Sequence, residues 1–219
     1  MIRTQEPEQT IPVFPLGTVL FPDGVLPLRI FEARYMDMVR DCLKNNTVFG
    51  VCLITDGAET GNPAAHEPIG CTARIDQWDM QQLGLLNIRT IGVQRFEILN
   101  AQVRADGLKV ASVQFLAPDA DTPIPDELGA CVTLLERVVD DLVNGDSNAG
   151  DSNAGDSNTS NSNSMQQMIR TPCQFESASW VSNRLCELLP FAPQTKHELM
   201  LLDDPLARLN FIHEFLCKQ

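Results

Sequence analysis

The stretch VFPLGTVLFPDGVLPLRIFEARY, residues 13–35, contains the transition between two kinds of structure. Most of it consists of short apolar runs, which are interrupted by Pro15, Pro22 and Pro27. Proline has no backbone N–H to donate to a strand ladder, so these runs should be sheet edges, strand starts or bends. The last five residues, Phe-Glu-Ala-Arg-Tyr, bring in a carboxylate and a guanidinium. We expect strands here that lead directly into a helix.

The helix is predicted from apolar residues that repeat every three or four positions. This spacing places them on one continuous face of an α-helix, and that face must be buried. The residues of the face are Phe31, Tyr35, Met38 and Cys42.

Glu32 and Arg34 are the charged residues at the start of this helix. Glu32 falls in the predicted first turn, where a negative charge suits the positive end of the helix dipole. The two residues are only two positions apart, so they should not face each other across a helix. We interpret both as parts of the scaffold, with a ligand contact as the alternative.

Short β-strands are predicted over residues 11–116, which are rich in Val, Ile and Phe and are broken by turns. The clearest hairpin is at Asp106-Gly107. An Asp-Gly pair between two such runs favours a tight turn with positive φ.

One strand, ARIDQWDMQ at residues 73–81, changes its alternation. Ile75 occupies an odd position, whereas Trp78 and Met80 occupy even ones, so the apolar set moves from one face to the other. Either a bulge restores the pairing, or Trp78 and Met80 project from the other face. In the second case Trp78, Met80 and Leu83 form an exposed apolar tip, which is the kind of surface that adaptable protein-binding sites use. These three residues are our candidate peptide-binding site.

A second, helical domain is predicted over residues 121–219, after a β-rich domain at residues 1–120. Asp204-Pro205 is a good start for its last helix, with the aspartate as N-cap and the proline at the first helical position. Residues 144–164, which repeat GDSNA, have no aromatic or large aliphatic side chain to offset the entropy of ordering them. We interpret them as a disordered insertion without the ligand pattern of a calcium site.

Signatures of catalysis are missing from the sequence. There is no phosphate-binding Gly-rich loop and no Gly-x-Ser-x-Gly elbow. His197-Glu198 begins like a zincin helix, but position 201 is leucine, so we expect a solvated helix start. The seven cysteines are scattered without a Cys-x-x-Cys pair, and most of them should be buried, reduced thiols. We therefore predict no enzyme, no metal and no cofactor.

Charge and hydropathy limit the partners and the location. A formal net charge of -13 repels phosphate backbones, so nucleic acid is an unlikely partner. No run has the length or hydropathy of a signal peptide or a membrane span, so we expect a cytoplasmic protein without membrane contact. No oligomeric state is predicted.

These motifs together resemble the substrate-binding N-terminal domain of Lon-type ATP-dependent proteases. The likeness covers most of the chain outside residues 144–164. The residues that carry it are Pro15, Leu16, Phe21, Pro22, Pro27, Phe31, Glu32, Arg34, Tyr35, Gly92, Arg95 and Phe96.

The resemblance implies an α+β fold, in which a PUA-like twisted β pseudo-barrel with one helix is followed by a C-terminal helical bundle. It also implies binding of polypeptide rather than chemistry. The ATPase and Ser-Lys peptidase modules of the proteases are absent, so we expect a stand-alone, non-catalytic form.

The favoured hypothesis is a non-enzymatic module that binds unfolded or extended polypeptide segments. A protease machine is a conceivable partner, for which the protein would act as an adaptor in ATP-dependent proteolysis. Two alternatives stay open: a PUA-like RNA-binding protein, against which the net charge weighs, and a structural subunit that associates with itself.

Overall fold

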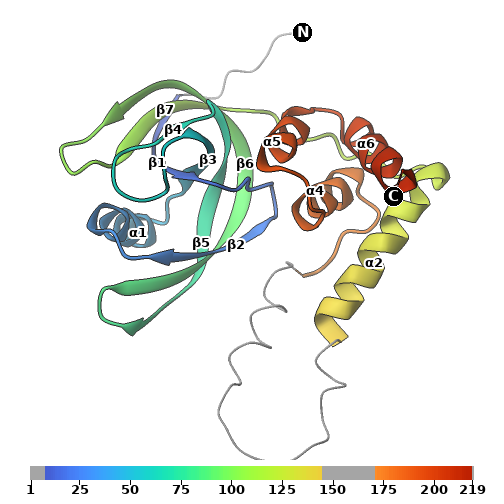
Figure 1. Ribbon diagram of the computed structural model, residues 1–219, viewed down its shortest axis with the longest axis horizontal. Helices are drawn as coiled ribbons and strands as arrows, with labels where there is room; N and C mark the ends of the chain where they lie inside the picture. The colour runs from blue at the N-terminus through green and yellow to red at the C-terminus, as the bar shows by residue number, and fades with distance from the viewer. Residues whose placement is uncertain (1–7, 145–170, 219) are drawn as a thin grey trace, which may run out of the picture.

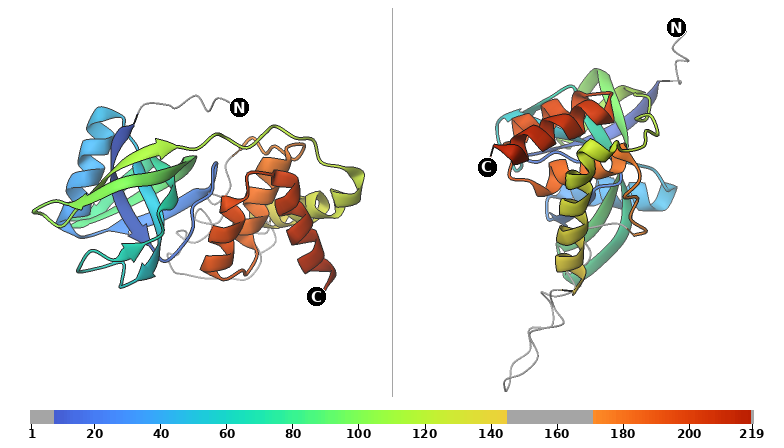
Figure 2. Two further views of the ribbon diagram at one scale, coloured as in Figure 1. Left: turned by 90° about the horizontal axis from the view of Figure 1, so that it is seen from above. Right: turned by 90° about the vertical axis from the view of Figure 1, so that its right-hand side faces the viewer.

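The computed structural model describes residues 8–144 and 171–218. The predicted insertion therefore lies outside the described residues, apart from Asn144 at the end of a helix. The chain forms two lobes, which lie side by side in Figures 1 and 2. The β lobe contains all the described strands and helix α1, and the helical lobe contains helices α2, α4, α5 and α6.

The β lobe is a curled sheet. Strands β1, β7, β6, β5 and β3 are antiparallel neighbours in this order, and β1 also pairs in parallel with β3, which closes the ring. Among the described strands, β2 pairs with β6 alone and lies outside this ring, so the sheet is a pseudo-barrel rather than a regular barrel. The bounds are β1 Gln9–Leu16, β2 Val25–Ile30, β3 Phe49–Asp56, β4 Ala65–His66, β5 Ile69–Gln82, β6 Leu85–Val103 and β7 Lys109–Phe115.

The interior of the ring is apolar. Val13 from β1, Phe49 from β3 and Phe96 from β6 have no exposed surface. The turn between β6 and β7 has Gly107 at φ 83°, a conformation that a side chain would strain. The predicted α+β pseudo-barrel and the hairpin at Asp106-Gly107 are thus confirmed.

Helix α1, Ala33–Asn45, packs against the sheet through Tyr35, Met38 and Cys42, which are 2–5% exposed. Phe31 does not belong to this face: its side chain is 58% exposed, so that part of the prediction was wrong. Glu32 is the N-cap and has an extended backbone, with φ −78° and ψ 134°. Because the helix starts only at Ala33, helical periodicity does not apply to Phe31.

The described part of the helical lobe begins with a short 3-10 helix, η1 (Asp126–Leu128), and continues with α2, α4, α5 and α6. The Asp204 side chain accepts a hydrogen bond from the backbone N–H of Leu206 over 2.9 Å, which confirms the predicted cap. α4 and α5 lie next to the sheet, and α2 is farther from it (Figures 1 and 2). The bounds are α2 Gly129–Asn144, α4 Ala178–Leu188, α5 Pro193–Leu201 and α6 Pro205–Cys217.

The apolar core is continuous between the lobes. Phe21 from the β lobe belongs to the same cluster of buried side chains as Leu185 of α4 and Leu209 of α6. The predicted domain boundary at residue 120 falls in the connection between β7 and η1. Figure 1 shows this connection passing from the sheet to the helices.

Candidate functional site

The three predicted site residues lie at the end of the β5–β6 hairpin, which we call the hairpin tip. The exposed fractions are 59% for Trp78, 42% for Met80 and 96% for Leu83. The tip extends past the rest of the β lobe, away from the helices (Figure 1). Exposed aromatic and Met side chains gathered at one place are typical of protein-binding surfaces. A role of these residues in peptide binding stays a prediction.

A bulge in β5 explains how Trp78 is oriented. Ile75 pairs with Thr90 and Gln77 with Arg89, so Asp76 is the extra residue. Trp78 then pairs with Ile88, which lies two positions from Thr90, and so Trp78 shares a face with Ile75.

The first of the two alternatives is therefore present, because the bulge keeps Trp78 on the face of Ile75. Projection from the other face was wrong, yet Trp78 is exposed nevertheless. Ile88 is only 3% exposed and belongs to the core that Tyr35 and Met38 of α1 share. The buried side chains of that core do not cover β5 at Trp78, although Trp78 lies on the same face of the sheet as Ile88. The apolar face of the sheet thus continues at Trp78 without cover from the described residues.

Glu32 and Arg34 contact each other, although their spacing predicted that they would not. Arg34 Nη2 lies 2.9 Å from Glu32 Oε2, which the extended N-cap backbone permits and a helical Glu32 would not. Arg34 also donates to the Gly107 carbonyl over 3.1 Å and lies 4.6 Å from the Tyr35 ring centroid. Arg34 therefore connects α1 to the β6–β7 turn.

A hollow of about 330 Å³ lies beside β2, between this strand and Glu59 and Thr60. Phe14 and Tyr35, whose rings are stacked at 3.9 Å, line it, and the exposed Phe31 also contributes. Burial raises the pKa of the Tyr35 hydroxyl, although the neighbouring Arg34 opposes the shift. The sequence reasoning missed this hollow because its walls come from three separate segments.

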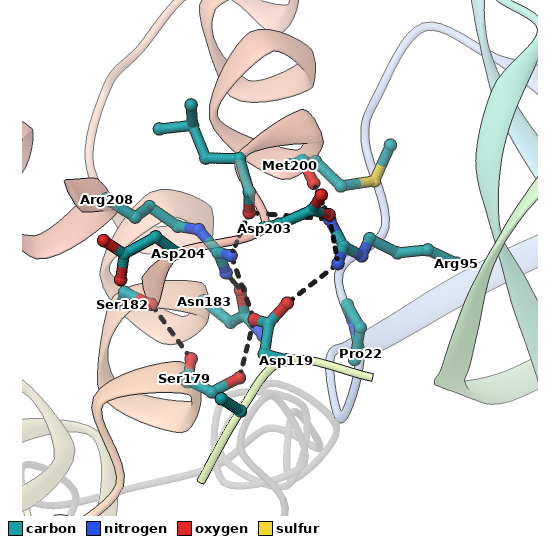
Figure 3. Close-up of polar contacts among 12 residues, drawn as sticks. Pro22, Arg95, Asp119, Ser179, Ser182, Asn183, Met200, Asp203, Asp204 and Arg208 are labelled. Atoms are coloured by element: carbon teal, nitrogen blue, oxygen red, sulfur yellow. Dashed lines mark hydrogen bonds and ion pairs between the residues drawn. The ribbon is translucent and has the colours of Figure 1, made fainter. Parts of the chain in front are cut away.

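Arg95 connects the two lobes. Its Nη1 donates to the Met200 carbonyl over 2.8 Å, and its Nη2 lies 2.9 Å from Asp119 Oδ1 and 3.1 Å from Asp203 Oδ1 (Figure 3). The other oxygen of Asp119 lies 2.9 Å from Arg208 Nη2. The side chains of Arg95, Asp119 and Arg208 are each buried, whereas that of Asp203 is 89% exposed, and the network joins β6, the interlobe connection and α6.

A second polar contact joins the lobes at α4. Arg184 donates to the Pro22 carbonyl over 2.7 Å and lies 3.2 Å from Glu187. Glu187 in turn accepts from the Phe21 N–H over 3.4 Å. Burial raises the pKa of the Glu187 carboxyl to about 7, against the opposing effects of Arg184, the Phe21 hydrogen bond and Lys196.

The other family-motif residues contribute packing and backbone geometry. Leu16, Phe21 and Phe96 are buried, and Pro15 lies in β1 opposite Cys52. Pro27 lies in β2, the strand that pairs only with β6. Gly92 approaches the Phe21 carbonyl so closely that a Cβ atom would overlap it.

The structure explains why His197 and Cys52 are poor candidates for metal or thiol chemistry. His197 is 3% exposed, with Nε2 3.1 Å from the Ile69 carbonyl oxygen, so the prediction of a solvated helix start was wrong. Burial raises the pKa of the Cys52 thiol to about 12, which makes it a poor nucleophile. Within residues 8–144 and 171–218, no three His, Cys, Asp or Glu side chains are grouped as a metal site.

The described helices also bear on membrane insertion: none of them combines the length and the apolar character needed to cross a bilayer.

The fold and the site together define an α+β protein whose curled sheet is fixed to a helical lobe and carries an exposed apolar hairpin. The family model of the ATP-dependent protease La (LON) substrate-binding domain matches residues 10–218. The chain therefore belongs to this family. Substrate binding related to proteolysis is the general function that the family description gives.

Solved structures agree with this assignment. The Lon N-terminal domain protein from Xanthomonas campestris has a TM-score of 0.70 at 32% identity, over 94% of this chain and 98% of the other. The N-terminal domain of the Mycobacterium avium complex Lon protease has a TM-score of 0.56 at 13% identity, over 94% and 97%. The second likeness shows the fold alone.

Curated relatives match over shorter segments. Protein cereblon of Xenopus tropicalis is 34% identical over 121 residues, which are 53% of this chain and 26% of that protein. Lon protease 2 of Myxococcus xanthus is 30% identical over 124 residues, which are 51% of this chain and 15% of the protease. The chain thus spans about a quarter or less of the length of these relatives.

Proposed function

We propose that this protein is a non-enzymatic module that binds unfolded or extended polypeptide segments through the hairpin tip. The observation that carries the proposal is the exposure of Trp78, Met80 and Leu83 in a member of a substrate-binding family. Soluble proteins rarely leave such side chains together in water unless a partner covers them. Unfolded chains expose the apolar side chains that would do so.

The similarity to a domain of Lon protease 2 supports a link to proteolysis. In this proposal the protein holds a segment and delivers it to a protease machine as an adaptor. The residues that fix the sheet support this role indirectly. Buried contacts of Arg95 and Arg34 hold the sheet in place, while the side chains of the hairpin tip are exposed. A rigid support lowers the entropic cost of binding at the tip.

The test compares a chemically unfolded polypeptide with its native form, at low and moderate salt. We expect retention of the unfolded form alone, and at least about tenfold weaker binding by Trp78→Ala/Met80→Ala, since about 1.4 kcal/mol of lost contact is a factor of ten. Leu99→Ala/Val103→Ala is the matched control, because these residues are also 47% and 54% exposed but lie at the other end of β6. Equal retention of native and unfolded polypeptide would refute the proposal.

Self-association through the hairpin tip is the competing outcome. Its signature is a mass in solution that rises with protein concentration and returns to that of one chain in the Trp78→Ala/Met80→Ala variant. In that case the tip would bind a copy of itself and not a substrate.

A further inference from the structure

Strand β5 has an edge without a strand partner. Its first part pairs with β3 as far as Ala73, which lies opposite Phe49. From Arg74 to Gln82 the described residues pair with it on one side only, through β6. The backbone groups on the other side of this segment can therefore accept another strand.

The devices that usually protect an edge are weak in this segment. Residues 74–82 contain no proline and no lysine, whereas β2, which also lies at an edge, contains Pro27 in its centre. Two bulges lie within the segment, at Asp76 and between Asp79 and Gln82, and the pairs from Gln77 to Asp79 between them are regular. A short extended strand fits an edge of this length.

The side chains of the segment differ between its two faces. Trp78 lies on the face of Ile88, and Met80 lies on the same face because side chains alternate with period two. Asp79 lies between them, is exposed and faces the other side. An added strand would therefore meet apolar surface at every second residue and a carboxylate in between.

Charge favours a basic residue opposite Asp79. The carboxylate of Asp76 is already paired with Arg89, whereas the whole chain carries a formal charge of -13. A cationic side chain beside Asp79 is attracted both by this carboxylate and by the net charge.

From the free edge and the alternating faces we infer that a partner polypeptide adds to residues 74–82 of β5 as an extended strand. Its apolar side chains occupy alternate positions against Trp78 and Met80, and a basic residue between them lies beside Asp79. This inference rests on the proposed function and specifies its mode of recognition, which is strand addition.

The first experiment uses three fluorescent peptides of about nine residues, which is within the usual range of strand lengths. One alternates Leu or Phe with Lys, the second has the same composition with apolar residues at helical spacing, and the third alternates with Glu. We expect the alternating Lys peptide to bind at least about tenfold more tightly than either other peptide. Tightest binding of the helically spaced peptide would overturn the inference in favour of a docked helix.

The second experiment tests the backbone contact. Alternate amides of the Lys peptide are N-methylated in two sets, one for each edge of the strand. The set that faces β5 removes several hydrogen bonds, each of which contributes about 1 kcal/mol, so binding should fall about tenfold or more. The other set should bind like the parent, and unchanged binding by both sets would overturn strand addition.

The third experiment uses Asp79→Lys, a surface change that should leave the fold intact. We expect it to reverse the preference between the Lys and Glu peptides. An unchanged preference would refute the role of Asp79. Retention of unfolded protein without any preference among peptides would leave the proposed function standing and remove this inference, whereas loss of both would remove both.

Discussion

Arg95 and Asp119 form an ion pair in which Nη2 lies 2.9 Å from Oδ1 and only 4% and 5% of the two side chains is exposed. Both ions are therefore almost completely removed from water. Such a pair offsets its desolvation cost only while both partners and their additional hydrogen bonds are present.

Asp119→Asn should destabilise the protein strongly, because it removes the buried carboxylate that neutralises Arg208 and leaves Arg95 with the exposed Asp203 as its ion-pair partner. Breaking a buried pair in this way costs about 3 to 5 kcal/mol, which urea unfolding would measure. The control is Asp37→Asn. Asp37 Oδ1 lies 2.8 Å from Arg40 Nη2, and the Arg40 side chain is 69% exposed. That surface pair should contribute less than about 1 kcal/mol, and equal losses in the two variants would contradict the assignment.

Glu187 should make stability depend on pH. Its pKa is raised from an ordinary value of 4.5 to about 7, so the folded protein holds a proton that the unfolded chain has lost between these values. The contribution of Glu187 to stability is thus fully present below about pH 4.5 and is lost as pH rises through 7, by up to about 3 kcal/mol.

Glu187→Gln removes this titration while keeping the size of the side chain. We expect the difference in unfolding free energy between the two proteins to change from pH 5 to pH 8 in favour of the glutamine variant. A difference that stays constant over this range would show that Glu187 is already ionised in the folded protein at pH 5.

Gly92→Ala should be destabilising for a steric reason. The Cβ would overlap the carbonyl oxygen of Phe21, while the Gly92 N–H and carbonyl are fixed by bonds to Gly24 and Asp23 of 2.8 and 2.9 Å. Forced overpacking of this kind costs about 1 to 3 kcal/mol. Gly129→Ala is the control, since nothing lies within 4 Å of a Cβ at that position, and thermal unfolding of both variants would separate crowding from a general effect of alanine.

Much of the fold follows from local patterns that the sequence displays. The hairpin at Gly107 and the cap at Asp204 depend on residues within a few positions, so propensity alone predicts them. The parity change around Trp78 likewise indicated the bulge. What the pattern could not indicate is where the core ends, because that depends on how far α1 reaches over the sheet.

Long-range contacts were beyond such reasoning. Arg95 was predicted only as a motif residue, and its partners Asp119 and Asp203 are 24 and 108 positions away. The prediction that Glu32 and Arg34 do not contact each other was wrong for the opposite reason. Their contact depends on the backbone of a single residue, Glu32, at the start of α1. A helix start that is assigned one or two residues too early changes the faces of the residues before it.

Phe31 and Tyr35 provide a direct test of where α1 begins, because a helix that included both would bury both. Tyr35 is 5% exposed and stacked on Phe14, so Tyr35→Ala should cost about 3 to 5 kcal/mol, the usual loss for a large buried aromatic side chain. Phe31 is 58% exposed, and Phe31→Ala should change stability by less than about 0.5 kcal/mol. Urea unfolding of the two variants measures both values, and a comparable loss for Phe31→Ala would mean that helix α1 starts before Glu32 and that its apolar face includes Phe31 after all.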